Sequence, residues 1–181
     1  MVYRMEIYVD GGCRRNGYSD AMGAAAAIRQ SRSGSKYWHR TRRLSKKPTN
    51  QRAEITAIIL GIQMALDAYD DLDSYPRLDV TIYSDSRYAV GCMTDWVYKW
   101  ANNGWVNSRG VKVSNKNLIK KASALDDKLS ELGNVTYSWI PRSENELADK
   151  HCNEELDAME QGGYYDSDSD DYGYDSDFDD D

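Results

Sequence analysis

The stretch YRMEIYVDGG, residues 3–12, decides the fold of this chain. Through residues 3–9 polar and apolar side chains roughly alternate, which is typical of a β-strand. Asp10-Gly11-Gly12 then predicts a tight turn, because glycine adopts backbone conformations that other residues avoid. The chain is therefore expected to begin with a strand that ends at an acidic side chain.

Two more strands are predicted directly after this one. The small apolar side chains of MGAAAAIRQ (22–30) indicate a strand packed closely beneath helices. Ser33-Gly34-Ser35 is a hairpin signal, and KYWHRTRRL (36–44) alternates again. The first 45 residues are expected to form three antiparallel strands.

Helices and strands alternate in the rest of the chain. Strands are predicted at 79–84 (DVTIYS) and 135–139 (VTYSW). Capping residues and apolar residues at helical spacing predict helices at about 50–65, at 86–100 as one or two helices, at 115–132 and at 143–159. Thr49 or Asn50 is expected to cap the first of these helices, and Ser143 or Asn145 to start the last. The order β-β-β-α-β-α-α-β-α predicts an α/β fold with a five-stranded mixed sheet, three antiparallel strands then two parallel ones, and helices on both faces.

Charge divides the chain into a body and a tail. Residues 161–181 contain nine aspartates and no lysine or arginine, and they repeat Asp, Ser, Tyr and Gly without apolar periodicity. Removing these nine from the 30 acidic residues leaves 21 against 23 lysines and arginines, so the net charge of −7 belongs to the tail and the body is near +2. We expect one folded domain at 1–160 and a disordered acidic tail at 161–181.

The basic residues of the body are concentrated. Residues 29–52 carry nine lysines and arginines and residues 96–121 carry six, and neither stretch contains an acidic residue. This favours binding to phosphate backbones, although an ordinary solvated surface is the common alternative.

Other features limit where the protein acts. No apolar run approaches membrane-spanning length, and the N-terminus lacks signal-peptide features. The three cysteines have no metal-ligand spacing and fit a reducing compartment. We expect an intracellular protein, cytoplasmic or nuclear rather than secreted, that binds no membrane and is a monomer.

Four acidic residues fall at the predicted ends of strands or starts of helices. Asp10 and Asp85 end the first and fourth strands, Glu54 lies in the first turn of the first long helix, and Asp149 lies near the start of the last helix. Each position alone has an ordinary role in turns or helix caps. In an open α/β sheet, however, such positions gather in one crevice, so together they favour convergence.

Converging carboxylates repel one another unless they hold a cation. Hard oxygen ligands favour Mg²⁺ or Mn²⁺. Two such ions about 4 Å apart activate a water and stabilise the leaving oxygen of an in-line displacement. Acidic residues with basic flanks therefore predict phosphodiester hydrolysis.

Four stretches resemble type 1 ribonuclease H, particularly its cellular eukaryotic branch. They are YVDGGCRRNG (8–17), TNQRAEITA (49–57), IYSDSRYAVGCMTDWVYKWANNGW (82–105) and NELAD (145–149). They occur in the family's order, and the resemblance covers roughly residues 3–158. It implies the ribonuclease H-like fold and endonucleolytic hydrolysis of the RNA strand of RNA–DNA hybrids, leaving 5′-phosphomonoesters, in R-loop and primer removal or related DNA replication and repair.

The resemblance also implies which residues do this. Two Mg²⁺ ions, or Mn²⁺, are bound by Asp10, Glu54, Asp85 and Asp149. The substrate-binding positions are Asn16, Asn50 and Gln51 for the RNA strand, Lys47, Thr49 and Asn115 for a phosphate pocket on the DNA strand, and Tyr88, Trp100 and Ser108 for the channel that holds the DNA sugar. The stretch 96–121 resembles the basic protrusion that grips hybrid DNA.

Three positions in these regions carry separate expectations. Lys47 stands where relatives carry arginine, so we expect looser phosphate contact there because lysine lacks the bidentate fork. Trp100 is expected to be an aromatic platform for a sugar without a 2′-hydroxyl. Trp96 and Trp105 are expected to pack in the core.

The connection before Asp149 departs from the family pattern. Many relatives carry a longer loop with a histidine, whereas residues 140–145 here are short and contain none. Arg142, at the scissile phosphate, and Glu144, as a proton relay, are the candidate replacements. His151 is expected to be structural, since it points away from Asp149 on the helix, and His39 is expected at the surface.

The acidic tail is a second departure. A solubilising role is the simpler interpretation. The alternative is a nucleic-acid mimic that folds over the basic channel, or a segment that binds a basic partner.

Two other functions compete with hybrid cleavage. One is a hybrid-binding module without turnover, which would have little use for clustered repelling carboxylates. The other is a DNA nuclease of the same fold, against which the TNQRAE stretch and the Trp100 channel favour hybrid discrimination.

Overall fold

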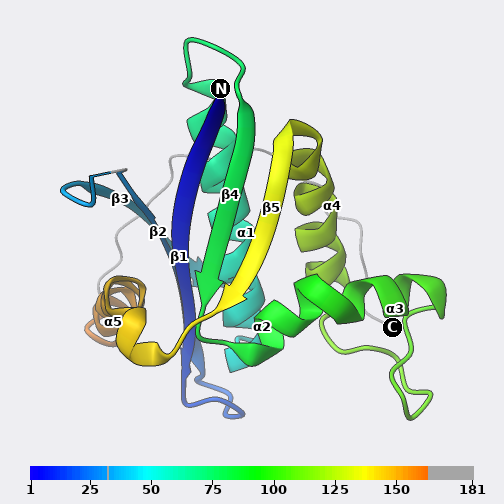
Figure 1. The fold of residues 1–181 in the computed structure, drawn as a ribbon. Helices are drawn as coiled ribbons and strands as arrows, with labels where there is room; N and C mark the ends of the chain where they lie inside the picture. The colour runs from blue at the N-terminus through cyan, green and yellow to red at the C-terminus, as the bar shows by residue number, and fades with distance from the viewer. Residues whose placement is uncertain (32, 163–181) are drawn as a thin grey trace.

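The computed structural model describes residues 1–31 and 33–162, which form a five-stranded mixed sheet with helices on both faces (Figure 1). The strands are β1 (Val2–Arg14), β2 (Met22–Gln30), β3 (Tyr37–Leu44), β4 (Arg77–Ser84) and β5 (Gly133–Trp139). Their order in the sheet is β3-β2-β1-β4-β5. β1, β2 and β3 are antiparallel, while β4 and β5 run parallel to β1. The predicted α/β class and mixed sheet are confirmed. The tail beyond Gly162 lies outside the described residues.

The helices follow the predicted order with one subdivision. They are α1 (Asn50–Asp70), α2 (Arg87–Gly91), the π-helical turn η1 (Cys92–Trp96), α3 (Val97–Asn102), α4 (Lys116–Leu132), the 3₁₀ turn η2 (Arg142–Glu144) and α5 (Glu146–Glu160). Of the two possible caps of α1, Thr49 is the one used, because its side chain accepts a hydrogen bond from the backbone nitrogen of Arg52 at 3.2 Å. No helix among the described residues is long and apolar enough to cross a membrane.

Small residues on β2 let helices pack closely on both faces of the sheet. Ala25 and Ala27 face the main core beneath α1. Ala24 and Ala26 face the opposite way, toward α5. Side chains alternate in this way because successive residues of a strand point to opposite faces. In Figure 1, α5 accordingly lies on one side of the sheet and α1 and α4 on the other.

The strand end predicted at Asp10 is wrong. β1 continues to Arg14, because β2 goes on pairing with it as far as Met22. The pairing with β4, however, stops at Val9 and Ser84. Asp10 is therefore the first residue of β1 that has no β4 neighbour, and it borders an opening at the edge of the sheet.

Gly11 allows the first turn of α1 to lie against this opening. A Cβ on Gly11 would lie 2.2 Å from the carbonyl carbon of Ala53, which no side chain permits. Ala53 directly precedes Glu54 on α1. The glycine expected for a turn is thus required for the close approach of a helix.

Candidate active site

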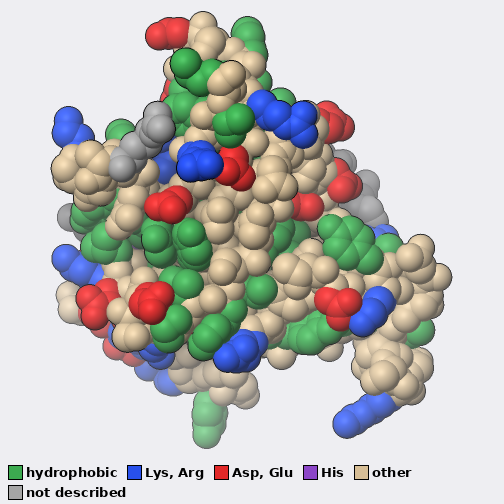
Figure 2. All heavy atoms as spheres, viewed as in Figure 1, with side chains coloured by type: hydrophobic (Ala, Val, Ile, Leu, Met, Phe, Trp, Pro, Cys, Tyr) green, Lys and Arg blue, Asp and Glu red, His purple; other side chains and the backbone are tan. Residues whose placement is uncertain are grey.

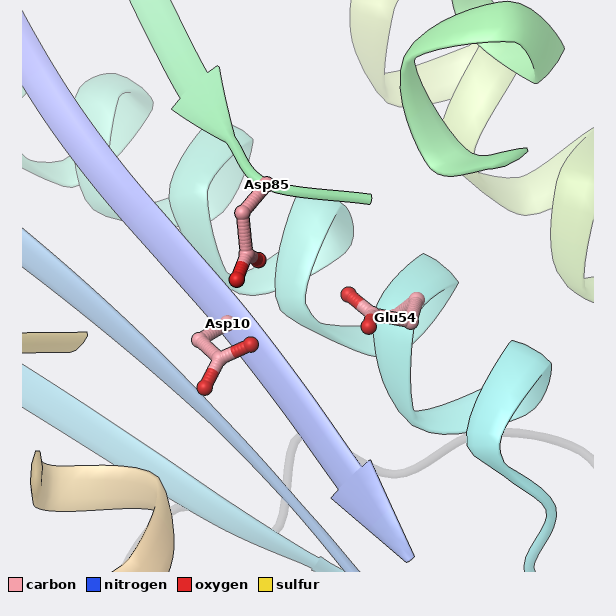
Figure 3. A group of neighbouring side chains, drawn as sticks. All are labelled: Asp10, Glu54 and Asp85. Atoms are coloured by element: carbon pink, nitrogen blue, oxygen red, sulfur yellow. The ribbon is translucent and has the colours of Figure 1, made fainter. Parts of the chain in front are cut away.

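All four predicted carboxylates line one cavity of about 240 Å³ at the opening beside Asp10. Carboxylate oxygens of Asp10, Glu54 and Asp85 lie within 4.8 Å of one another. Figure 3 shows these three side chains directed into a common space from β1, α1 and the loop after β4. Asp149 approaches from α5, on the other side of the sheet from α1.

The buried acids of this cavity are held mostly among like charges. Asp10 is 7% exposed and Glu54 is 8% exposed. Burial, together with the charges of Asp85 and Asp149, raises the pKa of Asp10 to about 7. Burial, and then the charges of Asp10 and Asp85, raise the pKa of Glu54 to about 9. Oε2 of Glu54 is buried with no hydrogen-bond partner among the described residues. A bound cation would compensate the charge of such a group.

Asp85 is held by the strand next to β4. The indole nitrogen of Trp139, at the end of β5, donates a 3.0 Å hydrogen bond to the carbonyl oxygen of Asp85. The backbone nitrogen of Ile140 donates to the carbonyl of Ser84, also at 3.0 Å. These two bonds fix the backbone from which Asp85 projects.

Asn145 is a positioning residue that the sequence showed only as a possible helix start. Its side chain makes no capping bond, and its Nδ2 instead donates to the carbonyl oxygen of Val9 at 2.9 Å. Asn145 is 1% exposed. Because Val9 precedes Asp10 and the carbonyl of Asn145 accepts from the backbone nitrogen of Asp149, this one residue ties two of the acids together. A contact between residues so far apart in sequence leaves no local signal.

Only one of the two expected substitutes for the missing histidine reaches the cavity. Arg142 lines the cavity and forms an ion pair with Asp149. Glu144 is exposed and lines a different hollow beside Tyr8. The geometry therefore places Glu144 away from the acids.

Both histidines lie away from the acids as well. The rings of His39 and His151 stack with centroids 4.1 Å apart, and His39 is exposed. The structural position expected for His151 and the surface position expected for His39 agree with this packing. Neither lines the carboxylate cavity.

An aromatic row extends away from the cavity along α2, η1 and α3. Neighbouring ring centroids are 5.9–6.2 Å apart through Tyr88, Trp96, Trp100 and Trp105. Trp105 is buried as expected, at 9% exposure, and Trp100 is half-buried. The core position expected for Trp96 is wrong, since this side chain is 36% exposed. Its ring lies over Gly91, 3.1 Å from where a Cβ would stand, and so packs on the helix surface.

The aromatic row lies at the base of a projecting segment. The side chain of Asn115 donates to the hydroxyl of Tyr88 at 3.4 Å, which joins the end of this segment to the row. Lysine and arginine side chains stand on the projection (Figure 2), which comprises α3 and the loop after it. Ser108 is exposed on this loop.

The remaining predicted substrate residues are Asn16, Lys47, Thr49, Asn50 and Gln51. Asn50 is exposed and lines the carboxylate cavity, and its neighbour Gln51 is exposed too. Asn16 and Lys47 are exposed and do not line the cavity. The hydroxyl of Thr49 is already engaged as the cap of α1.

Part of the first basic stretch is paired within the fold. On β3, Arg40 lies 2.7 Å from Asp67 and Arg42 donates to Gln63 at 3.2 Å, both on α1. Arg43 forms an ion pair with Glu155 on α5. Arg40 and Arg43 of this stretch are thus paired with acidic residues of the fold.

The family model for RNase H matches residues 3–157. The ribonuclease H of Haemophilus influenzae is 30% identical over 173 residues, which cover 91% of this chain and 98% of that protein. The ribonuclease H of Francisella tularensis subsp. novicida is 30% identical over 157 residues, covering 84% and 91%.

Solved structures share the fold. The N-terminal RNase H domain of a Mycobacterium tuberculosis protein superimposes with a TM-score of 0.62 at 22% identity, covering 88% of this chain and 97% of that one. LC11-RNase H1, solved in complex with an RNA/DNA hybrid, gives 0.59 at 21% identity, covering 86% and 98%. At these identities the likeness shows the fold alone, whereas the family model spans most of the chain. This chain therefore belongs to the RNase H family of ribonucleases.

Proposed function

We propose that this protein is an endonuclease that hydrolyses the RNA strand of RNA–DNA hybrids and leaves 5′-phosphomonoesters. The observation that carries the proposal is the carboxylate cavity, in which oxygens of Asp10, Glu54 and Asp85 lie within 4.8 Å of one another and Asp149 lines the same space. The family match supports this activity.

The residues of the cavity fit divalent metal ions. Glu54 has a buried oxygen without a partner among the described residues, and burial together with neighbouring negative charges raises the pKa of both Asp10 and Glu54. All the proposed ligands, Asp10, Glu54, Asp85 and Asp149, are hard oxygen donors, which suit two Mg²⁺ ions or Mn²⁺. Ions so placed supply an activated water and charge stabilisation at the scissile phosphate.

Other residues of the chain hold the acids in place and add a positive charge beside them. β1 and the Trp139 bond hold Asp10 and Asp85 at fixed positions, and Asn145 holds the start of α5 against β1. Arg142 places a positive charge at the rim of the cavity, beside Asp149. A guanidinium there is suited to contact the oxygens of the phosphate being cut.

Two groups of residues support discrimination of the hybrid. The amides of Asn16, Asn50 and Gln51 are suited to hydrogen-bond the 2′-hydroxyls of the RNA strand. Trp100, half-buried in the aromatic row, offers a face on which a deoxyribose packs. The basic projection around residues 96–121 then contacts the DNA strand, as in the cellular eukaryotic branch that the sequence resembles. Lys47, Thr49, Tyr88, Ser108 and Asn115 complete the proposed DNA contacts.

The alternatives explain the cavity less well. A module that only binds hybrids gains nothing from two buried acids whose charges oppose each other. A DNA nuclease of the same fold remains the second candidate. We further propose that the protein acts as an intracellular monomer, in the cytoplasm or nucleus, in R-loop and primer removal or related DNA replication and repair.

One assay tests the proposed activity against both alternatives. Labelled RNA–DNA hybrid, RNA duplex and DNA duplex are incubated with the full-length protein and Mg²⁺, beside the Asp10→Asn variant. We expect cleavage of the RNA strand of the hybrid only, and none by the variant. Cutting of the DNA duplex would establish the DNA nuclease instead, and tight hybrid binding without cutting would establish the binding module.

A further inference from the structure

Arg14 shares the carboxylate cavity with the four acids. It lies on the same face of β1 as Asp10 and Gly12, because side chains two residues apart in a strand point the same way. A strand rises about 3.3 Å per residue, which places Arg14 roughly 13 Å along β1 from Asp10. The cavity therefore has an acidic part at Asp10 and a basic part at Arg14.

Two acidic residues of α5 hold the guanidinium of Arg14. Its Nη2 lies 2.7 Å from Oδ1 of Asp157, and its Nη1 lies 2.8 Å from Oε2 of Glu160. Glu160 also reaches Nη1 of Arg15, at 3.4 Å. The side chain of Arg14 is 27% exposed, whereas those of Asp157 and Glu160 are 57% and 39% exposed. The guanidinium is thus oriented beside the cavity by partners that water reaches.

Partners of this kind are readily exchanged for a phosphate. Ion pairs between exposed side chains are weak because water and salt screen them. A phosphate, by contrast, accepts two parallel hydrogen bonds from a guanidinium and carries a full negative charge. A nucleic-acid strand whose scissile phosphate lies at Asp10 brings neighbouring phosphates past Gly12 toward Arg14.

We propose that Arg14 binds a phosphate of the RNA strand beside the scissile one, and that this phosphate replaces Asp157 and Glu160 as its partner. The assignment to the RNA strand rests on the proposed function. Asp157 and Glu160 then have two effects: they orient Arg14 in the free protein, and they compete with the substrate. Removing them is expected to act on affinity in the opposite direction from removing Arg14.

Hybrid affinity is measured with the full-length protein carrying Asp10→Asn, a substitution expected to prevent cleavage. The measurement is the fluorescence anisotropy of a labelled RNA–DNA hybrid, in the presence of Mg²⁺ and at several salt concentrations. Arg14→Ala is expected to weaken binding roughly tenfold. The slope of log K against log salt is expected to fall by about one, as for one lost phosphate contact. The matched control is Arg4→Ala, because Arg4 lies on the same face of β1 and pairs with Asp79 at 3.3 Å but does not line the cavity. If Arg14→Ala behaves like Arg4→Ala in affinity and slope, the proposal is wrong.

The double variant Asp157→Asn with Glu160→Gln separates phosphate binding from attachment of α5. The proposal expects tighter hybrid binding, by roughly threefold, because two competing charges are removed. If Arg14 only attaches α5 to β1, the double variant weakens binding and lowers the thermal midpoint as Arg14→Ala does. That result would overturn the proposal.

Uncharged methylphosphonate linkages show which strand of the hybrid Arg14 contacts. When methylphosphonates replace the phosphates beside the cleavage site in the RNA strand, the difference between Arg14 and its alanine variant is expected to disappear. The same replacement in the DNA strand is expected to preserve it, and the reverse pattern would overturn the assignment.

Failure of the proposed function has a separate signature. If the Asp10→Asn protein binds hybrid with an Arg14-dependent slope but the unsubstituted protein does not cut it, only the hydrolytic function fails. If no hybrid is bound at all, both proposals fail.

Discussion

The carboxylate cavity and the aromatic row are built in opposite ways. The cavity takes its acids from β1, α1, the loop after β4 and α5, which are far apart in sequence, and Asp10 and Glu54 are less than a tenth exposed. The aromatic row comes from one continuous stretch, residues 88–105, and its side chains range from buried Trp105 to exposed Trp96.

Because of this difference, substitutions in the cavity and in the aromatic row are expected to change different kinetic constants. The cavity holds several negatively charged side chains in fixed positions, and this arrangement is useful only when cations and a phosphate are present. Substitutions in the cavity are therefore expected to lower kcat. The aromatic row provides a contact surface for the substrate, so substitutions in the row are expected to raise KM. Four predictions test this division, in order of decreasing effect.

Glu54→Gln is expected to lower kcat by about a thousandfold or more, because it removes one of the three converging ligands. Single-turnover cleavage of a hybrid measures the effect, and the thermal midpoint shows that the variant is folded. An activity within tenfold of the parent would mean that Glu54 is not a ligand and that the cavity is not the reaction centre.

The metal-free protein is expected to lose stability as the pH rises. The folded-state pKa values, about 7 for Asp10 and about 9 for Glu54, exceed those of ordinary carboxyls, so between about pH 5 and 9 the folded protein binds more protons than the unfolded one. The free energy of unfolding therefore falls across this range by several kcal/mol, and Mg²⁺ is expected to restore most of the loss.

Urea unfolding at pH 5, 7 and 9, with EDTA or with Mg²⁺, measures this dependence. The double variant Asp10→Asn with Glu54→Gln is the control, in which the slope should largely disappear. A free energy of unfolding that rises between pH 5 and 9 in EDTA would contradict the arrangement of the cavity.

Trp100→Ala is expected to raise KM roughly tenfold with little change in kcat, since stacking on an aromatic face is worth about 1–3 kcal/mol per contact. Trp96→Ala is the comparison, because Trp96 is a neighbouring ring in the same row. Steady-state kinetics on one hybrid measures both variants. A fall in kcat as large as that of Glu54→Gln would break the division between cavity and row.

Arg142→Ala is expected to lower the single-turnover rate about fivefold, as for one lost charge-assisted contact at the phosphate. Arg4→Ala provides a matched control, because Arg4 also pairs with an acidic residue, Asp79 at 3.3 Å, and does not line the cavity. An unchanged rate would show that the ion pair with Asp149 is only structural.

Local patterns in the sequence predicted the elements and the acids well. The alternation of residues 3–9, the capping residue Thr49 and the strand at 79–84 each depend on a few neighbouring residues, and each corresponds to an observed element. Acids at strand ends and helix starts identified the four residues that line the cavity, because chain direction in an α/β sheet determines which edge these positions share.

Other features depended on contacts between distant segments. Asp-Gly-Gly predicted the end of a strand, but β2 keeps β1 extended to Arg14, and Gly11 serves the approach of α1. The bond from Asn145 to Val9 likewise had no local signal.

The sequence by itself determined the α/β fold, the family resemblance and the four acidic residues, because periodicity, caps and motifs are properties of short segments. Only the tertiary structure decided that Asp10 borders an opening where β4 ends, that Trp96 is exposed, and that Arg142 rather than Glu144 reaches the acids. The physical reason is that burial, pKa and ion pairing depend on which distant segments the fold brings into contact.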